Sequence, residues 1–142
     1  MTYKVIELNA SQVEDIENRL EQYDKNHITD GISGNIKIGV MDEDKLIAGA
    51  DADMTAFNIL YVSTVFVDED YRNKKVGTHL MTEIEKRAGL LGANMIRLDT
   101  FNWQGRDFYR SLGYEEVGSY ENKDDGFSEH FFLKRLWNNV HH

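Results

Sequence analysis

A basic loop directly before a helix is the segment of this sequence best suited to chemistry. Residues 69 to 81 read EDYRNKKVGTHLM, with Arg72, Lys74 and Lys75 just ahead of Gly77 and Thr78. Apolar periodicity predicts that a helix begins here, and the first N–H groups of a helix have no partners within it. Positive charge beside free N–H groups favours an anion, and glycine allows close backbone approach. The segment therefore predicts an anion site that suits a pyrophosphate.

Two common nucleotide-binding motifs do not explain this loop. The chain contains neither the Walker A pattern G-x-x-x-x-G-K-[ST] nor the dinucleotide pattern G-x-G-x-x-G. A solvated loop whose basic residues offset Asp68, Glu69 and Asp70 would account for the segment equally well. On its own, the loop leaves both interpretations open.

Composition narrows the class of protein. The 142 residues include 25 acidic and 16 basic ones, for a net charge of -9, and 41% are hydrophobic. Such a chain can form a single domain over residues 1–142 without disulfides or metals. The acidic balance argues against nucleic acid as a partner and suits a cationic substrate. The sequence has no apolar run of roughly 18 residues, which predicts no membrane span, and residues 1–25 lack a signal-peptide pattern.

The complete absence of cysteine excludes several chemistries. No thiolate nucleophile, thiolate–metal site or cysteine redox reaction is available. The absence also fits a reducing compartment, so we expect a cytoplasmic protein.

Hydrophobic patterning predicts a mixed α/β fold in the order β-α-β-β-β-α-β-α-β-β. The predicted strands span residues 3–8, 35–41, 46–54, 57–67, 94–101, 114–120 and 128–136. A strand–helix–strand unit in the middle implies one parallel pair within an otherwise antiparallel sheet.

The predicted helices carry apolar faces at helical spacing. The first would open with a capping box of Ser11 and Glu14, and its core face would comprise Val13, Ile16, Leu20 and Tyr23. The second would bury Leu80, Ile84, Ala88 and Leu91 and stop at Gly92. A short third helix is expected from about Trp103 to Leu112.

A second segment gives the basic loop its context. Residues 102–114, NWQGRDFYRSLGY, follow the other strand of the predicted parallel pair. Together the two segments resemble the GCN5-related N-acetyltransferase (GNAT) superfamily, whose phosphate loop follows Gln/Arg-x-x-Gly-x-Gly/Ala. Arg72 and Gly77 match that pattern, whereas Lys75 replaces its first glycine. The later pattern Asn-x-x-Ala-x-x-Phe-Tyr-x-x-x-Gly-Phe/Tyr is met by Asn102, Phe108, Tyr109, Gly113 and Tyr114, with Gly105 in place of alanine.

The resemblance implies a mostly antiparallel sheet with one splayed parallel strand pair and flanking helices. It also implies that acetyl-CoA binds in the splay, with its pantetheine arm paired to strand backbone. The implied cofactor-binding residues are Val65, Phe66, Val67, Arg72, Asn73, Lys74, Lys75, Val76, Gly77, Thr78, Asn102, Phe108 and Tyr109. No metal is implied.

Without cysteine, direct attack of a substrate amine on the thioester is the economical mechanism. A departing CoA thiolate then needs a proton, and Tyr109 is a reasonable donor, a role that the family often gives to a tyrosine here. A purely packing role for Tyr109 is the alternative.

Some family members place a glutamate base where this chain has Tyr61, which is a poor base. Other candidates are Asp53, Asp99, Glu129, His79 and His130, and a water chain without a dedicated base is equally open.

The sequence therefore predicts an acetyl-CoA-dependent N-acetyltransferase acting on a primary amine of a small molecule or peptide. A catalytically silent acyl-CoA sensor is the main alternative, and a non-CoA nucleotide binder is another. The acidic and aromatic content favours a small cationic amine, and a homodimer stays open.

Overall fold

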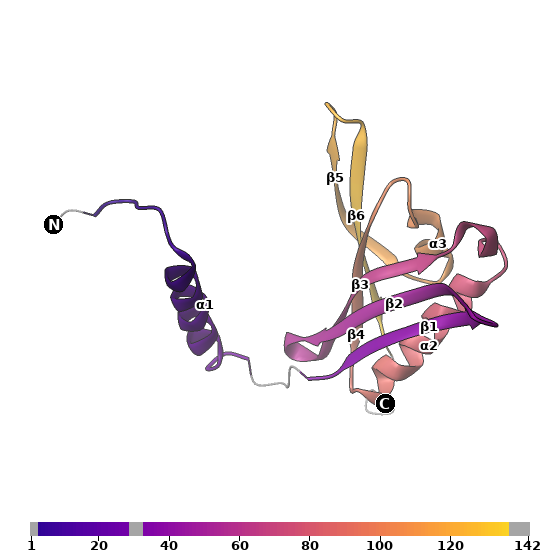
Figure 1. The fold of residues 1–142 in the computed structure, drawn as a ribbon, viewed down its shortest axis with the longest axis horizontal. Helices are drawn as coiled ribbons and strands as arrows, with labels where there is room; N and C mark the ends of the chain where they lie inside the picture. The colour runs from indigo at the N-terminus through magenta and orange to yellow at the C-terminus, as the bar shows by residue number, and fades with distance from the viewer. Residues whose placement is uncertain (1–2, 29–32, 137–142) are drawn as a thin grey trace.

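A single mixed sheet organises the chain. The computed structural model describes residues 3–28 and 33–136. In chain order the elements are α1 (Ala10–Asp24), β1 (Asn35–Asp42), β2 (Lys45–Thr55), β3 (Ile59–Val67), α2 (Val76–Leu90), β4 (Met95–Phe101), α3 (Arg106–Ser111), β5 (Glu115–Asn122) and β6 (Phe127–Arg135). The six strands lie in the order β1-β2-β3-β4-β6-β5, and of these pairings only β3 with β4 is parallel (Figure 1). The predicted fold class is confirmed.

Helix α2 covers one face of the sheet across β1, β2 and β3. Its buried side chains are Leu80, Met81, Ile84 and Ala88, and they join Leu60, Ile96 and Phe132 in the core. Leu91 was predicted to be part of this face but is 39% exposed, because the helix ends at Leu90 and Gly92 follows with a positive φ of 87°.

The two parallel strands separate halfway along their length. Their pairing runs from Ile59 with Met95 to Val62 with Leu98 and stops there, although both strands continue. At this point β3 contains a bulge, since Asp51 pairs with Thr64 while Ala52 pairs with Val62. The extra residue, Ser63, donates a hydrogen bond from its hydroxyl to the Asp51 carbonyl at 3.1 Å. A bulge bends a strand, so it accounts for the splay.

The N-terminal predictions are wrong in three respects. Residues 3–8 form no strand, and the capping box uses Asn9 and Gln12 in place of Ser11 and Glu14. Helix α1 buries none of its side chains, although a core face was predicted for it. Figure 1 shows α1 well apart from the sheet, so neither the extended segment nor the helix packs on the sheet of its own chain.

Two element boundaries differ from the prediction for local reasons. Strand β3 starts at Ile59 because residues 56–58 form a 3₁₀ turn in which Phe57 and Asn58 both have φ of 61°. Helix α3 starts only at Arg106, because residues 100–105 form a turn held by side-chain hydrogen bonds.

Within the described ranges, the chain has no helix long and apolar enough to span a membrane.

Candidate active site

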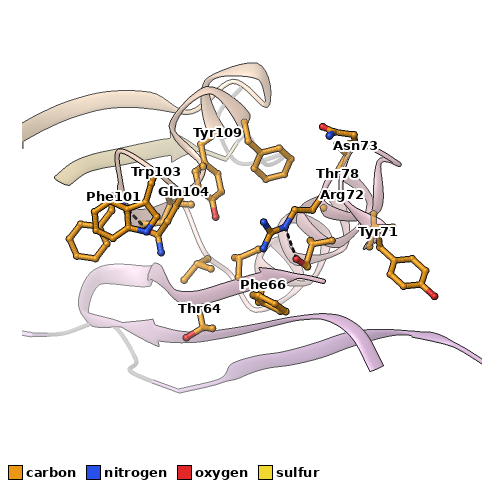
Figure 2. Close-up of a pocket in the computed structure, with 18 of the residues that line it drawn as sticks. Thr64, Phe66, Tyr71, Arg72, Asn73, Thr78, Phe101, Trp103, Gln104 and Tyr109 are labelled. Atoms are coloured by element: carbon orange, nitrogen blue, oxygen red, sulfur yellow. Dashed lines mark hydrogen bonds between the residues drawn. The ribbon is translucent and has the colours of Figure 1, made fainter. Parts of the chain in front are cut away.

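A cleft of about 890 Å³ opens where β3 and β4 diverge. Its walls are the last residues of β3, the loop before α2 with the first turn of that helix, and the segment from the end of β4 to α3 (Figure 2). Of the residues expected to bind the cofactor, the cleft is lined by Val65, Phe66, Val67, Arg72, Asn73, Lys75, Val76, Gly77, Thr78, Phe108 and Tyr109. The splay of one strand pair thus creates a single cavity between the two sequence motifs.

The N-terminus of α2 faces this cleft without a cap of its own. Lys75 is the N-cap residue, in a left-handed conformation (φ 66°), and its side chain makes no capping hydrogen bond. The first hydrogen bond of the helix runs from the His79 N–H to the Lys75 carbonyl at 3.0 Å. The N–H groups of Val76, Gly77 and Thr78 precede it, so they are free to bind an anion.

The basic side chains of the loop occupy different places. The Arg72 Nε donates to the Val67 carbonyl at 2.9 Å, and its guanidinium lies 5.8 Å from the Phe66 ring centroid, beside the cleft (Figure 2). Lys75 lines the cleft, whereas Lys74 is not among the lining residues and its Nζ lies 5.7 Å from the Tyr71 ring centroid. Of the three basic side chains, Arg72 and Lys75 therefore line the cleft and Lys74 does not.

The end of β3 has one unpaired edge. On its other edge, Val65, Phe66 and Val67 pair with Ala50, Gly49 and Ala48 of β2. Beyond Val62, β3 has no pairing with β4, so its backbone groups on that side face the cleft. An unpaired strand edge accepts an extended ligand by the same hydrogen bonds that join strands.

Tyr109 combines a buried ring with a hydroxyl that reaches the cleft. The residue is 8% exposed, and its ring contacts the rings of Phe108 and Tyr114 at centroid distances of 5.2 and 5.8 Å. Figure 2 shows its oxygen pointing into the cavity. Burial, with a smaller contribution from the Asp99 charge, raises the pKa of Tyr109 to about 12. The phenol therefore stays protonated at neutral pH.

The turn before α3 is built to hold Tyr109 in place. Gln104 Oε1 accepts from the Phe101 N–H at 2.8 Å, and Thr100 Oγ1 accepts from the Gly105 N–H at 3.0 Å. Gly105 leaves room for the tyrosine ring, because a Cβ atom there would lie 2.9 Å from Tyr109 Cε2. Alanine, the family's usual residue at this position, would require the ring to shift.

Asn102 has a structural position beside the cleft. Its side-chain Oδ1 accepts from the Ser128 N–H at 3.0 Å, and its own N–H donates to the Ser128 carbonyl at 3.0 Å. Asn102 does not line the cavity. It joins the end of β4 to β6 and so supports the turn that carries the cleft residues.

Trp103 is a cleft residue that sequence reasoning missed, whereas Asp99 and Tyr61 were considered from the sequence only as positions for a catalytic base. Asp99, at the end of β4, lines the cavity and accepts from the Tyr61 hydroxyl at 2.9 Å. Burial and this hydrogen bond raise the pKa of Tyr61. Trp103 is 65% exposed in the cavity wall and stacks on Phe101 at 4.7 Å. For Trp103, the signal in the sequence was an aromatic residue in a turn, which is too common to indicate a binding site.

The other candidate bases lie outside the cleft. His130 is buried, with Nδ1 3.0 Å from Glu116 Oε1 and Nε2 2.8 Å from Ser128 Oγ. Glu129 accepts from the Tyr120 hydroxyl at 2.5 Å. Asp53, His79, Glu129 and His130 are all missing from the cavity wall. Across the described ranges, no cluster of His, Cys, Asp or Glu could hold a metal ion.

Known proteins share this sequence pattern and fold. The model of the acetyltransferase (GNAT) family matches residues 3–114. A crystal structure of an acetyltransferase from Bacillus cereus ATCC 14579 superposes with a TM-score of 0.85 at 32% identity, over 94% of this chain and 98% of that one. Blasticidin-S acetyltransferase from Streptomyces morookaense is 27% identical over 94 residues, which are 63% of this chain and 67% of that protein.

A further solved structure of the same fold contains acetyl coenzyme A. The putative streptothricin acetyltransferase from Bacillus anthracis, in complex with acetyl coenzyme A, shares the fold at a TM-score of 0.66 and 18% identity, over 78% of this chain and 67% of that one. The family model covers most of the chain. The cleft lies where β3 and β4 of this chain diverge. The chain belongs to the acetyltransferase (GNAT) family.

Proposed function

We propose that this protein transfers the acetyl group of acetyl-CoA directly to a primary amine of a small cationic molecule. One observation carries the proposal: the Tyr109 hydroxyl and the Asp99 carboxylate line the same cleft as an uncapped helix N-terminus. That arrangement supplies an anion site, a protonated donor and a negative charge for an ammonium group. A binding module would need only the first of these.

The pyrophosphate of CoA suits the N-terminus of α2. The free N–H groups of Val76, Gly77 and Thr78 would bind its oxygens, with Arg72 and Lys75 adding positive charge. The pantetheine arm, which carries amides, would then run along the unpaired edge of β3 at residues 65–67. The pantetheine arm would then extend from the N-terminus of α2 to the point where β3 and β4 diverge, and it would place the thioester there.

The chemistry requires a balanced movement of protons. The amine nitrogen attacks the thioester carbon, the carbon–sulfur bond breaks, and the products are the acetylated amine and CoA thiol. A backbone N–H of β3 in the stretch 65–67 would stabilise the oxyanion. The bound ammonium group first loses one proton, to Asp99 or to water, which frees the lone pair that attacks. After the attack the nitrogen loses a second proton and the sulfur gains one, so that one proton is released to solvent overall.

Tyr109 is the donor for the sulfur. With a pKa of about 12, its hydroxyl is protonated throughout the neutral range and donates a hydrogen bond to the thiolate as charge develops. Because a thiol has a pKa of about 8.5, complete transfer is uphill for this phenol in the free protein. We therefore assign to Tyr109 the donation of a hydrogen bond to the developing thiolate, and the proton of the CoA thiol is then supplied by water.

Asp99 suits the recognition of a cationic acceptor. It lies in the wall of the cleft, exposed to solvent, and is held by the Tyr61 hydroxyl at 2.9 Å. The Trp103 ring, also in the wall, offers a face for a cation. The names of two relatives, blasticidin-S and streptothricin acetyltransferase, support a small molecule with amino groups as the acceptor class.

A thiol-release assay tests the proposal. Acetyl-CoA is incubated with the protein and a panel of aminoglycosides, other antibiotic amines, polyamines, amino acids and peptides, and free CoA is measured. We expect release with at least one small cationic amine, and mass spectrometry of that acceptor should show one added acetyl group.

Three outcomes would contradict the proposal in different ways. Tight acetyl-CoA binding by calorimetry without thiol release for any amine would support the silent sensor instead. Release with peptide N-termini alone would support the transferase activity but exclude a small molecule as the acceptor. ATP bound as tightly as acetyl-CoA would point to a nucleotide binder that does not use the strand edge.

A further inference from the structure

Residues 3–24, which we call the N-terminal arm, leave their apolar side chains exposed to solvent. In α1 these are Val13 (41% exposed), Ile16 (50%), Leu20 (60%) and Tyr23 (66%), which share one face at helical spacing. Tyr3, Val5, Ile6 and Leu8 are also exposed. Figure 1 shows the arm projecting away from the rest of the molecule.

An arm of this kind is only marginally stable alone in water. Isolated helices shorter than about 12–15 residues are marginal, and most helices in proteins owe their stability to packing of the apolar face. The 15 residues of α1 have a capping box but no packed face. The sequence pattern of residues 3–8 predicts a strand, and a strand needs an edge to pair with.

The exposed surface of the chain has room for a large interface. A compact monomer of 16.5 kDa is expected to expose about 7,600 Å². This chain exposes 10574 Å². The excess is more than twice the roughly 800 Å² that each partner buries in a standard interface.

The sheet offers a matching surface on the face opposite α2. Gly39 of β1 and Gly49 of β2 are direct cross-strand partners, and the next partner of Gly49 is Phe66 of β3. Phe66 is 57% exposed and Leu46 is 66% exposed, and Leu46 lies over Gly39, where an added Cβ would be 2.9 Å from its Cδ1. Two glycines bordered by exposed apolar side chains make a shallow apolar surface that admits a helix.

The same region ends in a free strand edge. Strand β1 is the first strand of the sheet order, so among the described strands only β2 pairs with it. Edge strands present unpaired N–H and C=O groups that accept another strand. The edge and the apolar surface are adjacent, because Gly39 belongs to β1 itself.

We propose that the arm of one copy packs on the sheet of a second copy, and that the exchange is reciprocal in a two-fold symmetric dimer. Residues 3–8 extend the sheet at the edge of β1, and α1 places Ile16 and Leu20 on the surface formed by Gly39, Leu46, Gly49 and Phe66. Exchange of an identical element gives each arm the partner that it lacks in its own chain.

Two observations favour a second copy over other occupants. The arm points away from its own sheet. One chain thus carries both the segments that lack a packing surface, residues 3–8 and α1, and the surfaces that could accept them, the edge of β1 and the adjacent apolar surface. The arm also has counterparts in a relative: the alignment with the Bacillus cereus acetyltransferase leaves only 6% of this chain uncovered, less than the arm itself.

Molar mass and a matched pair of variants form the first test. Light scattering on the full chain should give about 33 kDa, twice the mass of one chain. Leu20→Asp should shift the protein toward a monomer, while Asn18→Asp, which adds the same charge on the opposite face of α1, should leave the dimer intact. A monomeric wild type, or a Leu20→Asp protein that stays fully dimeric, would overturn the proposal.

Intermolecular NOEs on the wild-type protein provide the second test, which does not depend on any variant folding. A methyl-labelled chain is mixed with an unlabelled chain, and contacts between the two are selected by isotope filtering. We expect contacts from Ile16 and Leu20 of one copy to Leu46 of the other. Contacts of these methyl groups only within one chain, or only with α1 of the other copy, would refute the exchange. The result is independent of the proposed transferase activity, since neither test measures turnover.

Discussion

The ring of Phe108 lies against the backbone of Gly77, so that a Cβ atom on that glycine would be 3.1 Å from Phe108 Cζ. Gly77 belongs to the basic loop and the first turn of α2, and Phe108 belongs to α3. The two segments that suggested the family from the sequence are therefore in direct contact. The glycine has a packing role as well as an expected role in anion binding.

Replacing Gly77 tests both roles. We expect Gly77→Ala to fold and to weaken CoA binding only slightly, since Phe108 can shift by a few tenths of an ångström. Gly77→Val should displace the ring, lower the melting temperature and reduce CoA affinity by about tenfold or more. Calorimetry with CoA and thermal unfolding of both variants check this. Normal CoA affinity in Gly77→Val would show that the first turn of α2 does not bind the ligand.

Tyr109→Phe removes the proposed donor and keeps the ring. Because a positioned acid contributes about 10²–10⁴-fold, kcat should fall by roughly 10²-fold or more. The affinity for acetyl-CoA should stay within a few-fold, because the hydroxyl matters mainly once charge develops on sulfur. In the structure, the hydroxyl donates no hydrogen bond to another described residue, so the melting temperature should change little. Near-normal turnover would assign Tyr109 to packing alone.

Lys75→Glu and Lys74→Glu should separate the two lysines of the loop. Lys75 lines the cleft and Lys74 does not, so reversal of Lys75 should weaken CoA binding more strongly, by about three- to tenfold. The salt dependence of CoA affinity should also decrease for Lys75→Glu. Titrations at low and high salt measure both effects. Equal losses in the two variants would indicate that only the overall charge of the loop matters.

Asp99→Asn tests the acceptor side of the cleft. The substitution keeps the shape and an oxygen for the Tyr61 hydroxyl but removes the negative charge. We expect KM for a cationic amine to rise by about tenfold, whereas the KM for acetyl-CoA should not change. Asp53→Asn is the control, because Asp53 pairs with Tyr61 across β2 and β3 but does not line the cleft. Identical kinetics in the two variants would exclude Asp99 from acceptor binding.

The buried tyrosines predict a loss of stability in alkali. Burial raises the pKa of Tyr109 to about 12, and burial together with Glu85 raises that of Tyr114 further. A group whose pKa is raised on folding binds its proton more tightly in the native state, so its contribution is complete below pH 10 and is lost as the pH rises through the folded value. The free energy of unfolding should therefore fall between pH 10 and 12. Tyr109→Phe should make this fall less steep, and an unchanged slope would contradict the assignment.

The strands and the second helix were predictable because their patterns are local and are satisfied locally. Residues 35–41 and 46–54 alternate and lie within one antiparallel hairpin, and Leu80, Ile84 and Ala88 share the buried face of α2. The loop at Arg72 was identified from its basic residues beside a predicted helix start, and the Phe108–Tyr109 pair from its resemblance to the family pattern. Each of these signals depends on residues a few positions apart, which the sequence displays directly.

Other features depend on contacts between distant residues, and only the tertiary structure decided them. The bulge at Ser63 opens the parallel pair, and no local pattern announces it. Asp99 becomes part of the cleft because the pairing of β4 with β3 ends at Leu98. The apolar pattern of residues 3–24 correctly predicted a helix and wrongly predicted its burial, because periodicity shows which face is apolar but not whether a surface within reach will cover it.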